Sequence, residues 1–174
     1  LRDGNQAFIR PMDVETKLRC FQMLTRIGFR EIEVGYPASS HEEFEFLRRL
    51  IGEGKIPDDV RITVLTAARS DLIRRTIESI RGAEQATIHC YAATSELHRR
   101  FVFDKSEQEL AAMAVESTKQ IRDAVESAGL RGRIRYEFSP EEFSDSRLGF
   151  VGDVTDICID PVTDLLEKGY IPVI

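Results

Sequence analysis

The chain has 174 residues, of which 42% are hydrophobic and 31% are charged, a composition typical of a soluble globular domain. Its formal charge of −6 comes from 24 basic and 30 acidic residues interspersed along the chain, so we expect no nucleic-acid partner. The longest apolar runs are far shorter than the roughly 20 residues that cross a bilayer, and residues 1–15 do not resemble a signal peptide. We therefore expect no membrane association and a cytoplasmic location.

The cysteines are few and widely separated, at Cys20, Cys90 and Cys158. Their spacing offers neither a zinc-binding pair nor an even disulfide framework. We expect reduced thiols that fill apolar space, because a free cysteine behaves as a small buried hydrophobe.

The first clear element is an amphipathic helix between Asp13 and Gly28, in which apolar residues recur at three- and four-residue steps. Asp13 is placed to cap its first turn and Gly28 to end it. Residues 31–35 follow at once, and their alternating apolar and charged side chains predict a strand.

The same helix-then-strand pair is predicted three more times. Ser39 or Ser40, then Ser70 and then a residue near Ser106 can each cap a helix. The strands that follow these helices are predicted at residues 61–65, 86–90 and 134–138. Four such units in succession indicate an α/β protein with a parallel sheet.

Two architectures fit this pattern, the closed (β/α)8 TIM barrel and the open doubly wound sheet. Potentially reactive side chains lie in or next to the predicted strands. They are Arg2 and Asp3 at the start of the chain, His89 and Tyr91, and Glu137. In a barrel the carboxyl ends of the strands converge on one mouth, so groups far apart in sequence can meet around one substrate. We therefore favour the barrel.

Several motifs point in the same direction. The opening residues 1–6 (LRDGNQ) resemble the signature at the end of the first strand in the α-isopropylmalate and homocitrate synthase family of metal-dependent TIM barrels. Further similar stretches follow in the family's order: residues 28–37 (GFREIEVGYP), 56–66 (IPDDVRITVLT), 87–100 (TIHCYAATSELHRR) and 135–141 (RYEFSPE). The resemblance covers residues 1–145, which we interpret as the N-terminal part of a synthase catalytic domain.

The resemblance implies roles for two residues of the opening motif. Arg2 would polarise the carbonyl of a 2-oxo acid, and Asp3 would bind a divalent metal ion, either Mg²⁺, Mn²⁺ or Zn²⁺. A fixed guanidinium stabilises the alkoxide that forms when a carbonyl is attacked, and a hard cation prefers carboxylate oxygens. Outside this family context the same dipeptide would be interpreted as a surface ion pair.

The resemblance also implies that Glu137 is the catalytic acid or base and that His89 and Tyr91 bind substrate. The spacing of His89 and Tyr91 places both on one face of a strand. Gln6 is a further candidate for the substrate pocket. Taken alone, Glu137 would be an outward-facing strand residue and His89 a hydrogen-bonded core residue.

The chain departs from the family in its metal ligands. The family completes its metal site with a His-x-His pair on a later strand, and no histidine follows His98 in this sequence. A single carboxylate holds a divalent ion weakly, so we expect at best a partial metal site.

After Phe143 the resemblance ends. Residues 148–174 instead resemble acetylglutamate kinase, with LGFVGDV followed by a short helix and GYIPVI. We predict a tail of different origin at residues 146–174, with a βαβ-like pattern and without the glycine-rich loop or lysines for phosphoryl transfer. The expected fold is thus a partial, truncated barrel with open sheet edges that favour a homo-oligomer.

The leading functional hypothesis is a fragment of a 2-isopropylmalate synthase, which condenses acetyl-CoA with 3-methyl-2-oxobutanoate in leucine biosynthesis. A homocitrate synthase-like relative would need a further basic residue for the second carboxylate of its substrate, for which Arg69 and Arg99 are candidates. The alternative of a different class is a non-catalytic chimeric or truncated domain that keeps the scaffold.

Overall fold

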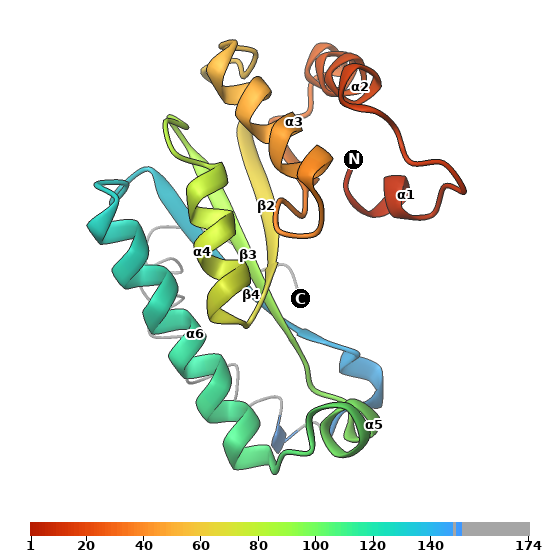
Figure 1. Ribbon diagram of the computed structural model, residues 1–174, viewed down its shortest axis with the longest axis vertical. Coiled ribbons are helices and arrows are strands. Elements are labelled where there is room, and N and C mark those ends of the chain that lie inside the picture. The colour runs from red at the N-terminus through yellow and green to blue at the C-terminus, as the bar shows by residue number, and fades with distance from the viewer. Residues whose placement is uncertain (148, 151–174) are drawn as a thin grey trace.

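The computed structural model describes residues 1–147, 149 and 150, and its elements alternate between helix and strand along the chain (Figure 1). The helices are α1 (Asp3–Gln6), α2 (Val14–Ile27), α3 (His41–Gly52), α4 (Ser70–Ser79), α5 (Glu96–His98) and α6 (Glu107–Ser127), with a π-helical turn η1 (Arg99–Phe103) and a 3-10 turn η2 (Phe143–Asp145). The strands are β1 (Glu31–Gly35), β2 (Arg61–Ala67), β3 (Ala86–Ala93) and β4 (Ile134–Glu141).

The predicted helix caps are mostly confirmed. The side chains of Asp13, Ser40 and Ser106 accept hydrogen bonds from backbone N–H groups in the first turns of α2, α3 and α6. Gly28 ends α2 with a φ of 115°, a left-handed conformation that favours glycine. The prediction for Ser70 is wrong, because Ser70 is the first residue of α4 and its hydroxyl donates to Gln120 Oε1 on α6.

The strand predictions are confirmed in position, but three of the four strands extend further than expected. β1 has the predicted bounds, whereas β2, β3 and β4 continue to Ala67, Ala93 and Glu141. The added residues are paired with the neighbouring strand. The hydrogen-bond ladder between β3 and β4, for example, continues as far as Ala93 and Glu141. Backbone pairing with a neighbour therefore sets these strand ends, and the apolar pattern of one segment cannot reveal it.

The sheet is wholly parallel, with the strands in the order β1-β2-β3-β4. The register places Ile62 of β2 beside Ile32 of β1 and Ala86 of β3, so side chains on adjacent strands form continuous rows. Each connection between successive strands contains a helix, as parallel strands require.

One face of this sheet forms the hydrophobic core. The apolar strand residues on that face belong to a single buried cluster with residues of α2, α3, α4 and α6; the strand members include Ile32, Val34, Ile62, Val64, Ile88 and Cys90. All four long helices therefore cover the same face, as Figure 1 shows for α3, α4 and α6. A sequential parallel sheet with helices on one side is consistent with part of a TIM barrel, whereas a doubly wound sheet has helices on both faces.

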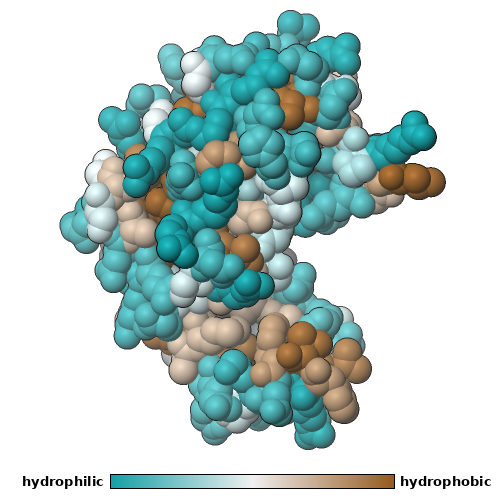
Figure 2. Space-filling model, viewed as in Figure 1, coloured by the Kyte–Doolittle hydropathy of each residue, from teal (hydrophilic) through white to brown (hydrophobic). Residues whose placement is uncertain are grey.

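The helix side of the molecule is largely hydrophilic at its surface, with one conspicuous apolar area (Figure 2). This area lies over α5 and η1, where Leu97, Phe101 and Val102 are 63%, 81% and 61% exposed. Ile9, in the loop after α1, is also fully exposed.

Among the described residues, Cys20 and Cys90 form no disulfide bond. Cys158 and the elements predicted for residues 151–174 lie outside the described part of the chain. In the described part, no helix is both long enough and apolar enough to cross a membrane.

Candidate active site

The face of the sheet opposite the helices carries polar side chains. Strand residues alternate between the two faces, so every second residue of β1, β3 and β4 points away from the core. The register places His89 of β3 beside Glu137 of β4, and Thr63 of β2 between Glu33 of β1 and Thr87 of β3. The predicted site residues of the strands therefore share one face.

Arg2 lies along the free edge of β1. Its backbone N–H donates to the carbonyl oxygen of Glu33 at 3.2 Å, which places the first residues of the chain alongside that strand. Its side-chain Nε donates to Glu33 Oε1 at 2.6 Å. The Arg2 side chain is 19% exposed and that of Glu33 is 25% exposed, so this ion pair is largely shielded from water.

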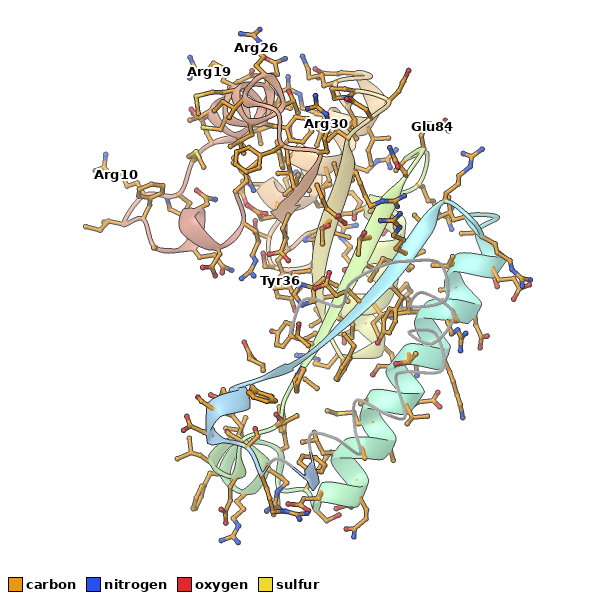
Figure 3. All side chains as sticks on the ribbon, turned by 180° about the vertical axis from the view of Figure 1, so that it is seen from behind. Arg10, Arg19, Arg26, Arg30, Tyr36 and Glu84 are labelled. Carbon is orange, nitrogen blue, oxygen red and sulfur yellow. The ribbon has the colours of Figure 1, made fainter. Side chains whose placement is uncertain are left out.

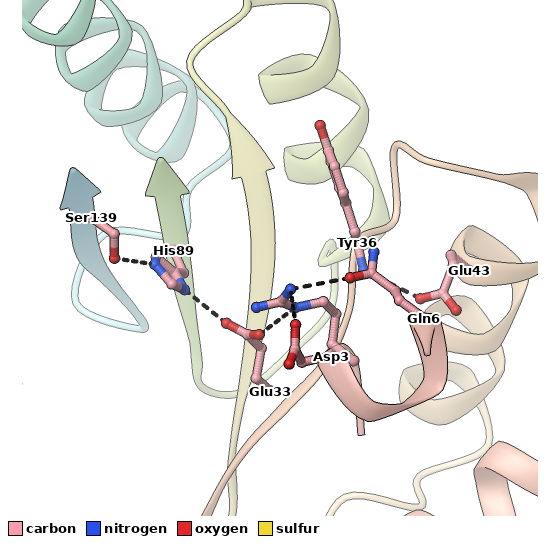
Figure 4. Close-up of polar contacts among 8 residues, drawn as sticks. Asp3, Gln6, Glu33, Tyr36, Glu43, His89 and Ser139 are labelled. Atoms are coloured by element: carbon pink, nitrogen blue, oxygen red, sulfur yellow. Dashed lines mark hydrogen bonds and ion pairs between the residues drawn. The ribbon is translucent and has the colours of Figure 1, made fainter. Parts of the chain in front are cut away.

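Two residues of α1 complete the surroundings of the Arg2 guanidinium. Arg2 Nη1 donates to Asp3 Oδ1 at 3.0 Å and to Gln6 Oε1 at 3.3 Å. The Asp3 side chain is 86% exposed, whereas that of Arg2 is largely buried. The short helix thus folds the predicted metal ligand and the predicted pocket residue back onto one guanidinium, as Figure 4 shows.

Glu33 connects this group to the strands further along the sheet. Glu33 Oε2 lies 2.7 Å from His89 Nδ1, and His89 Nε2 lies 2.5 Å from Ser139 Oγ on β4 (Figure 4). A continuous polar chain therefore runs from Arg2 through Glu33 and His89 to Ser139, across all four strands of the described sheet. We call this chain the polar relay.

The charge state of Glu33 is set by competing effects. Burial raises the pKa of its carboxyl group, but the hydrogen bonds from His89 and Arg2, together with the positive charge of Arg2, outweigh burial and leave the pKa below its ordinary value. Glu33 is therefore ionised near neutral pH, and its carboxylate can only accept hydrogen bonds.

Glu137 occupies the middle of β4, in register with His89. Its side chain is half-buried, and within residues 1–147 its carboxylate has no hydrogen-bond or ion-pair partner. Arg2 and Glu137 thus border the same face of the sheet, with Glu33 and His89 between them. This is the convergence that the barrel interpretation requires.

Tyr91 lies on the same face as His89, two residues further along β3. Its ring meets that of Tyr36 edge to face, with centroids 6.4 Å apart. Tyr36 follows β1, and its hydroxyl accepts a hydrogen bond from the backbone N–H of Ala67 at the end of β2. Burial, and the neighbouring Tyr91, raise the pKa of Tyr36 to about 12, so the Tyr36 hydroxyl stays protonated near neutral pH.

A buried ion pair holds the carboxyl end of β1 in place. Lys17 of α2 is 2% exposed, and its Nζ lies 2.6 Å from Glu43 Oε1 of α3. Glu43 Oε2 accepts a hydrogen bond from the backbone N–H of Tyr36 at 3.2 Å. A Cβ at Gly35 would overlap Glu43 Oε2, so a larger residue at this position would displace the Glu43 carboxylate. Two helices are thereby tied to the loop that follows Glu33.

The described residues do not complete a metal site. No group of three or more His, Cys, Asp and Glu side chains in residues 1–147 could hold a metal ion together. Asp3 supplies one exposed carboxylate, and a hard divalent cation takes about six oxygen ligands. A metal site that includes Asp3 stays a prediction.

Neither candidate for binding a second substrate carboxylate is free. Arg69 Nη2 pairs with Asp71 at 2.9 Å, and Arg99 Nη1 donates to the carbonyl oxygen of Lys105. Both guanidinium groups thus contact residues outside the polar relay.

The sequence analysis did not single out Glu33 or Ser139. Both belong to motifs quoted for the family resemblance, but the contacts that join them to His89 connect residues 56 and 50 positions apart. The one local signal is the glutamate at the centre of β1, since an acidic residue in a half-buried parallel strand needs a partner.

Comparison with known proteins identifies the family to which the chain belongs. The model of the HMGL-like family matches residues 1–161, which extends past residue 145, where we predicted the resemblance to end. The resemblance of residues 148–174 to acetylglutamate kinase stays a prediction.

Among curated proteins, the chain is similar to several named 2-isopropylmalate synthase. It is 46% identical to that of Parvibaculum lavamentivorans over 97% of this chain and 29% of the relative. It is 52% identical to that of Ralstonia nicotianae over 88% of this chain and 27% of the relative. It is 48% identical to that of Thermobifida fusca over 92% of this chain and 28% of the relative. The chain spans less than a third of the length of these relatives, and the family match over most of its residues establishes that it belongs to the HMGL-like family.

Proposed function

We propose that the polar face contributes to a Claisen-type condensation of acetyl-CoA with 3-methyl-2-oxobutanoate, the 2-isopropylmalate synthase reaction of leucine biosynthesis, in the cytoplasm. The observation that carries this proposal is the Arg2 guanidinium, which Glu33 holds beside Asp3 on the face that also bears His89 and Glu137. The names of the curated relatives support the same reaction.

Arg2 is the group that would stabilise the developing charge. When a carbon nucleophile attacks the carbonyl of the oxo acid, negative charge accumulates on the carbonyl oxygen. A guanidinium that is already held in position stabilises this oxygen without reorganising. Glu33 supplies that positioning through a short contact with Nε, and Nη1 contacts Asp3 of α1.

Glu137 is the proposed acid-base residue. Formation of the nucleophile requires loss of a proton from the methyl group of acetyl-CoA, and a carboxylate with no hydrogen-bond partner in residues 1–147 is available to accept one. Its half-buried position in β4 limits solvation of its charge.

The remaining predicted residues would bind substrate. Gln6 and His89 each make a hydrogen bond within the network around Arg2, and Tyr91 lies one step further along the same face. These residues would orient the oxo acid between Arg2 and Glu137.

Asp3 would give one ligand to a divalent metal ion, either Mg²⁺, Mn²⁺ or Zn²⁺, which would add a second positive charge at the oxo acid. The described residues provide no further cluster of ligands, so every step proposed here is assigned to side chains of this chain. We also propose a homo-oligomer, because the outer strands of an open parallel sheet need to be paired or covered.

The proposal is tested by calorimetric titration of the chain with 3-methyl-2-oxobutanoate and separately with 2-oxoglutarate, in the presence of Mg²⁺. We expect binding of the first acid, and a loss of affinity of about 100-fold in Arg2→Ala, as follows from removal of a charged donor to an oxyanion-type group. Release of thiol from acetyl-CoA, followed in the same samples, reports turnover.

Arg10→Ala is the matched control. Arg10 is exposed in the loop after α1 and projects away from the sheet in Figure 3. Equal affinity of Arg2→Ala and Arg10→Ala for the oxo acid would contradict the proposed role of Arg2. Binding without thiol release would favour the non-catalytic scaffold.

A further inference from the structure

We infer that Glu33 is a positioning residue of the proposed site, which holds the Arg2 guanidinium and the His89 imidazole simultaneously and fixes the ring proton of neutral His89 on Nδ1. The connection to substrate rests on the proposed function. The inferred state of the imidazole rests on the contacts alone.

The geometry assigns one oxygen of Glu33 to each partner. Oε1 lies 2.6 Å from Arg2 Nε, and Oε2 lies 2.7 Å from His89 Nδ1. Both distances are typical of charge-assisted hydrogen bonds, which are about twice as strong as neutral ones. One carboxylate thus connects a residue at the start of the chain with a residue on β3.

The contact between Glu33 and His89 is not a contact between neighbouring strands. β1 and β3 both pair with β2, so the two side chains meet across an intervening strand. At this level β2 presents Thr63, a small residue that pairs with both Glu33 and Thr87. The connection across the sheet therefore depends on a long acidic side chain at this one position of β1.

The chemistry of a carboxylate determines the tautomer. An ionised carboxylate has no proton to donate, so His89 Nδ1 must carry the hydrogen that joins it to Glu33. In neutral imidazole the other nitrogen is then an acceptor, and Nε2 receives its hydrogen bond from the hydroxyl of Ser139. Glu33 thereby determines the direction of every hydrogen bond in the polar relay.

The position of Arg2 follows from the same carboxylate. The hydrogen bond from Arg2 Nε to Glu33 holds one edge of the guanidinium, while Nη1 contacts Asp3 and Gln6. Within residues 1–147, Nη2 has no partner and is the donor left for a ligand oxygen. A substitution of Glu33 should therefore change His89 and Arg2 together, although neither is its neighbour in sequence.

The experiment compares imidazole nitrogen shifts of the chain with those of Glu33→Gln, measured by two-dimensional ¹⁵N NMR under conditions in which the ring is neutral. The amide of glutamine can accept from or donate to Nδ1, so it no longer selects one tautomer. We expect the ratio of the Nδ1–H to the Nε2–H form to fall about tenfold, the size that one hydrogen bond to a charged group provides. An unchanged ratio would overturn the inference.

Two further variants keep the test decisive. Glu31→Gln changes the same residue type on the same strand and face, but Glu31 contacts Thr87 instead of His89 or Arg2, so the ratio should not change. Ser139→Ala should leave the proton on Nδ1, because Glu33 holds it there. A shift of the proton to Nε2 in Ser139→Ala, or an equal response to Glu31→Gln, would show that Glu33 does not set the tautomer.

The outcome is separable from that of the proposed function. Titration of Glu33→Gln with 3-methyl-2-oxobutanoate should show about tenfold weaker binding, since Arg2 loses its charged anchor. If the unaltered chain binds no oxo acid, the proposed function fails while the imidazole measurement still decides the inference. If the acid binds equally well to Glu33→Gln and the unaltered chain, the positioning of Arg2 by Glu33 is refuted.

Discussion

The two faces of the sheet are made by the same strands, but one is apolar and buried and the other is polar and hydrogen-bonded. On the helix-covered face, Ile32, Ile62 and Ile88 form part of one continuous buried cluster. On the other face, the alternate residues of the same strands include Glu33 and His89, joined by directional hydrogen bonds at short distances. The period of two along a strand separates these sets cleanly.

The comparison indicates that apolar packing on one face stabilises the fold, whereas hydrogen bonds on the other face position the candidate site residues. Apolar burial contributes about 25 cal/mol for each Å² removed from water and has no preferred direction, so the core face tolerates exchange of similar side chains. The polar relay buries little area, and its function depends on which atom donates to which. Substitutions on the two faces should therefore differ in kind as well as in size.

The largest loss of stability is expected from the ion pair between Lys17 and Glu43, which lies at the carboxyl end of β1. Lys17→Met should lower the free energy of unfolding by about 3 to 5 kcal/mol, because it leaves the Glu43 carboxylate without its buried partner. Urea denaturation followed by circular dichroism measures this loss. The double variant Lys17→Met/Glu43→Gln should recover part of it, and a single-variant loss below about 1 kcal/mol would show that the pair does not hold α2 to α3.

A smaller loss is expected from within the core face. Ile88 is fully buried on β3, so Ile88→Ala should cost about 3 kcal/mol through lost burial and the cavity that remains. Its neighbour Thr87 points to the polar face and keeps its shape in Thr87→Val, for which we expect less than about 1 kcal/mol. The same urea titration measures both. Equal costs for these adjacent residues would contradict the division of the sheet into two faces.

Much of the core face could be predicted from sequence, because its signals are local. The alternation in residues 31–35 gave the bounds of β1, and Asp13 and Ser106 marked the starts of α2 and α6 through hydrogen bonds within four residues of themselves. The spacing of His89 and Tyr91 was sufficient to place both on one face of β3.

The polar relay could be predicted only in part. Arg2 and His89 were identified through the family resemblance, but Glu33, which connects them, was not. Its role depends on the parallel register and on a contact that crosses β2, and no property of residues 28–37 alone encodes either. Strand ends beyond residues 65, 90 and 138 were missed for a similar reason, since pairing with the next strand decides them.

The smallest and most specific effect is expected at Glu33, as a dependence of stability on pH. Burial raises the pKa of its carboxyl group, but His89 and Arg2 lower this pKa by a larger amount. The folded-state pKa therefore lies below the ordinary value of 4.5. The unfolded state then binds the proton more readily, and the contribution of Glu33 to stability is present above the ordinary pKa. It is lost as the pH falls through the folded-state pKa.

The unaltered chain should therefore have a higher free energy of unfolding than Glu33→Gln at about pH 7. This difference, the stability margin of Glu33, should shrink as the pH falls below about 4.5. Urea midpoints of both proteins across this range measure the margin. Glu31→Gln should show almost no difference from the unaltered chain at any pH, because Glu31 is exposed and its one side-chain hydrogen bond within residues 1–147 is that with Thr87. A margin for Glu33 that stays constant with pH would mean that its contacts with Arg2 and His89 do not favour the ionised carboxylate, and the polar face would then lack the fixed charge on which both partners depend.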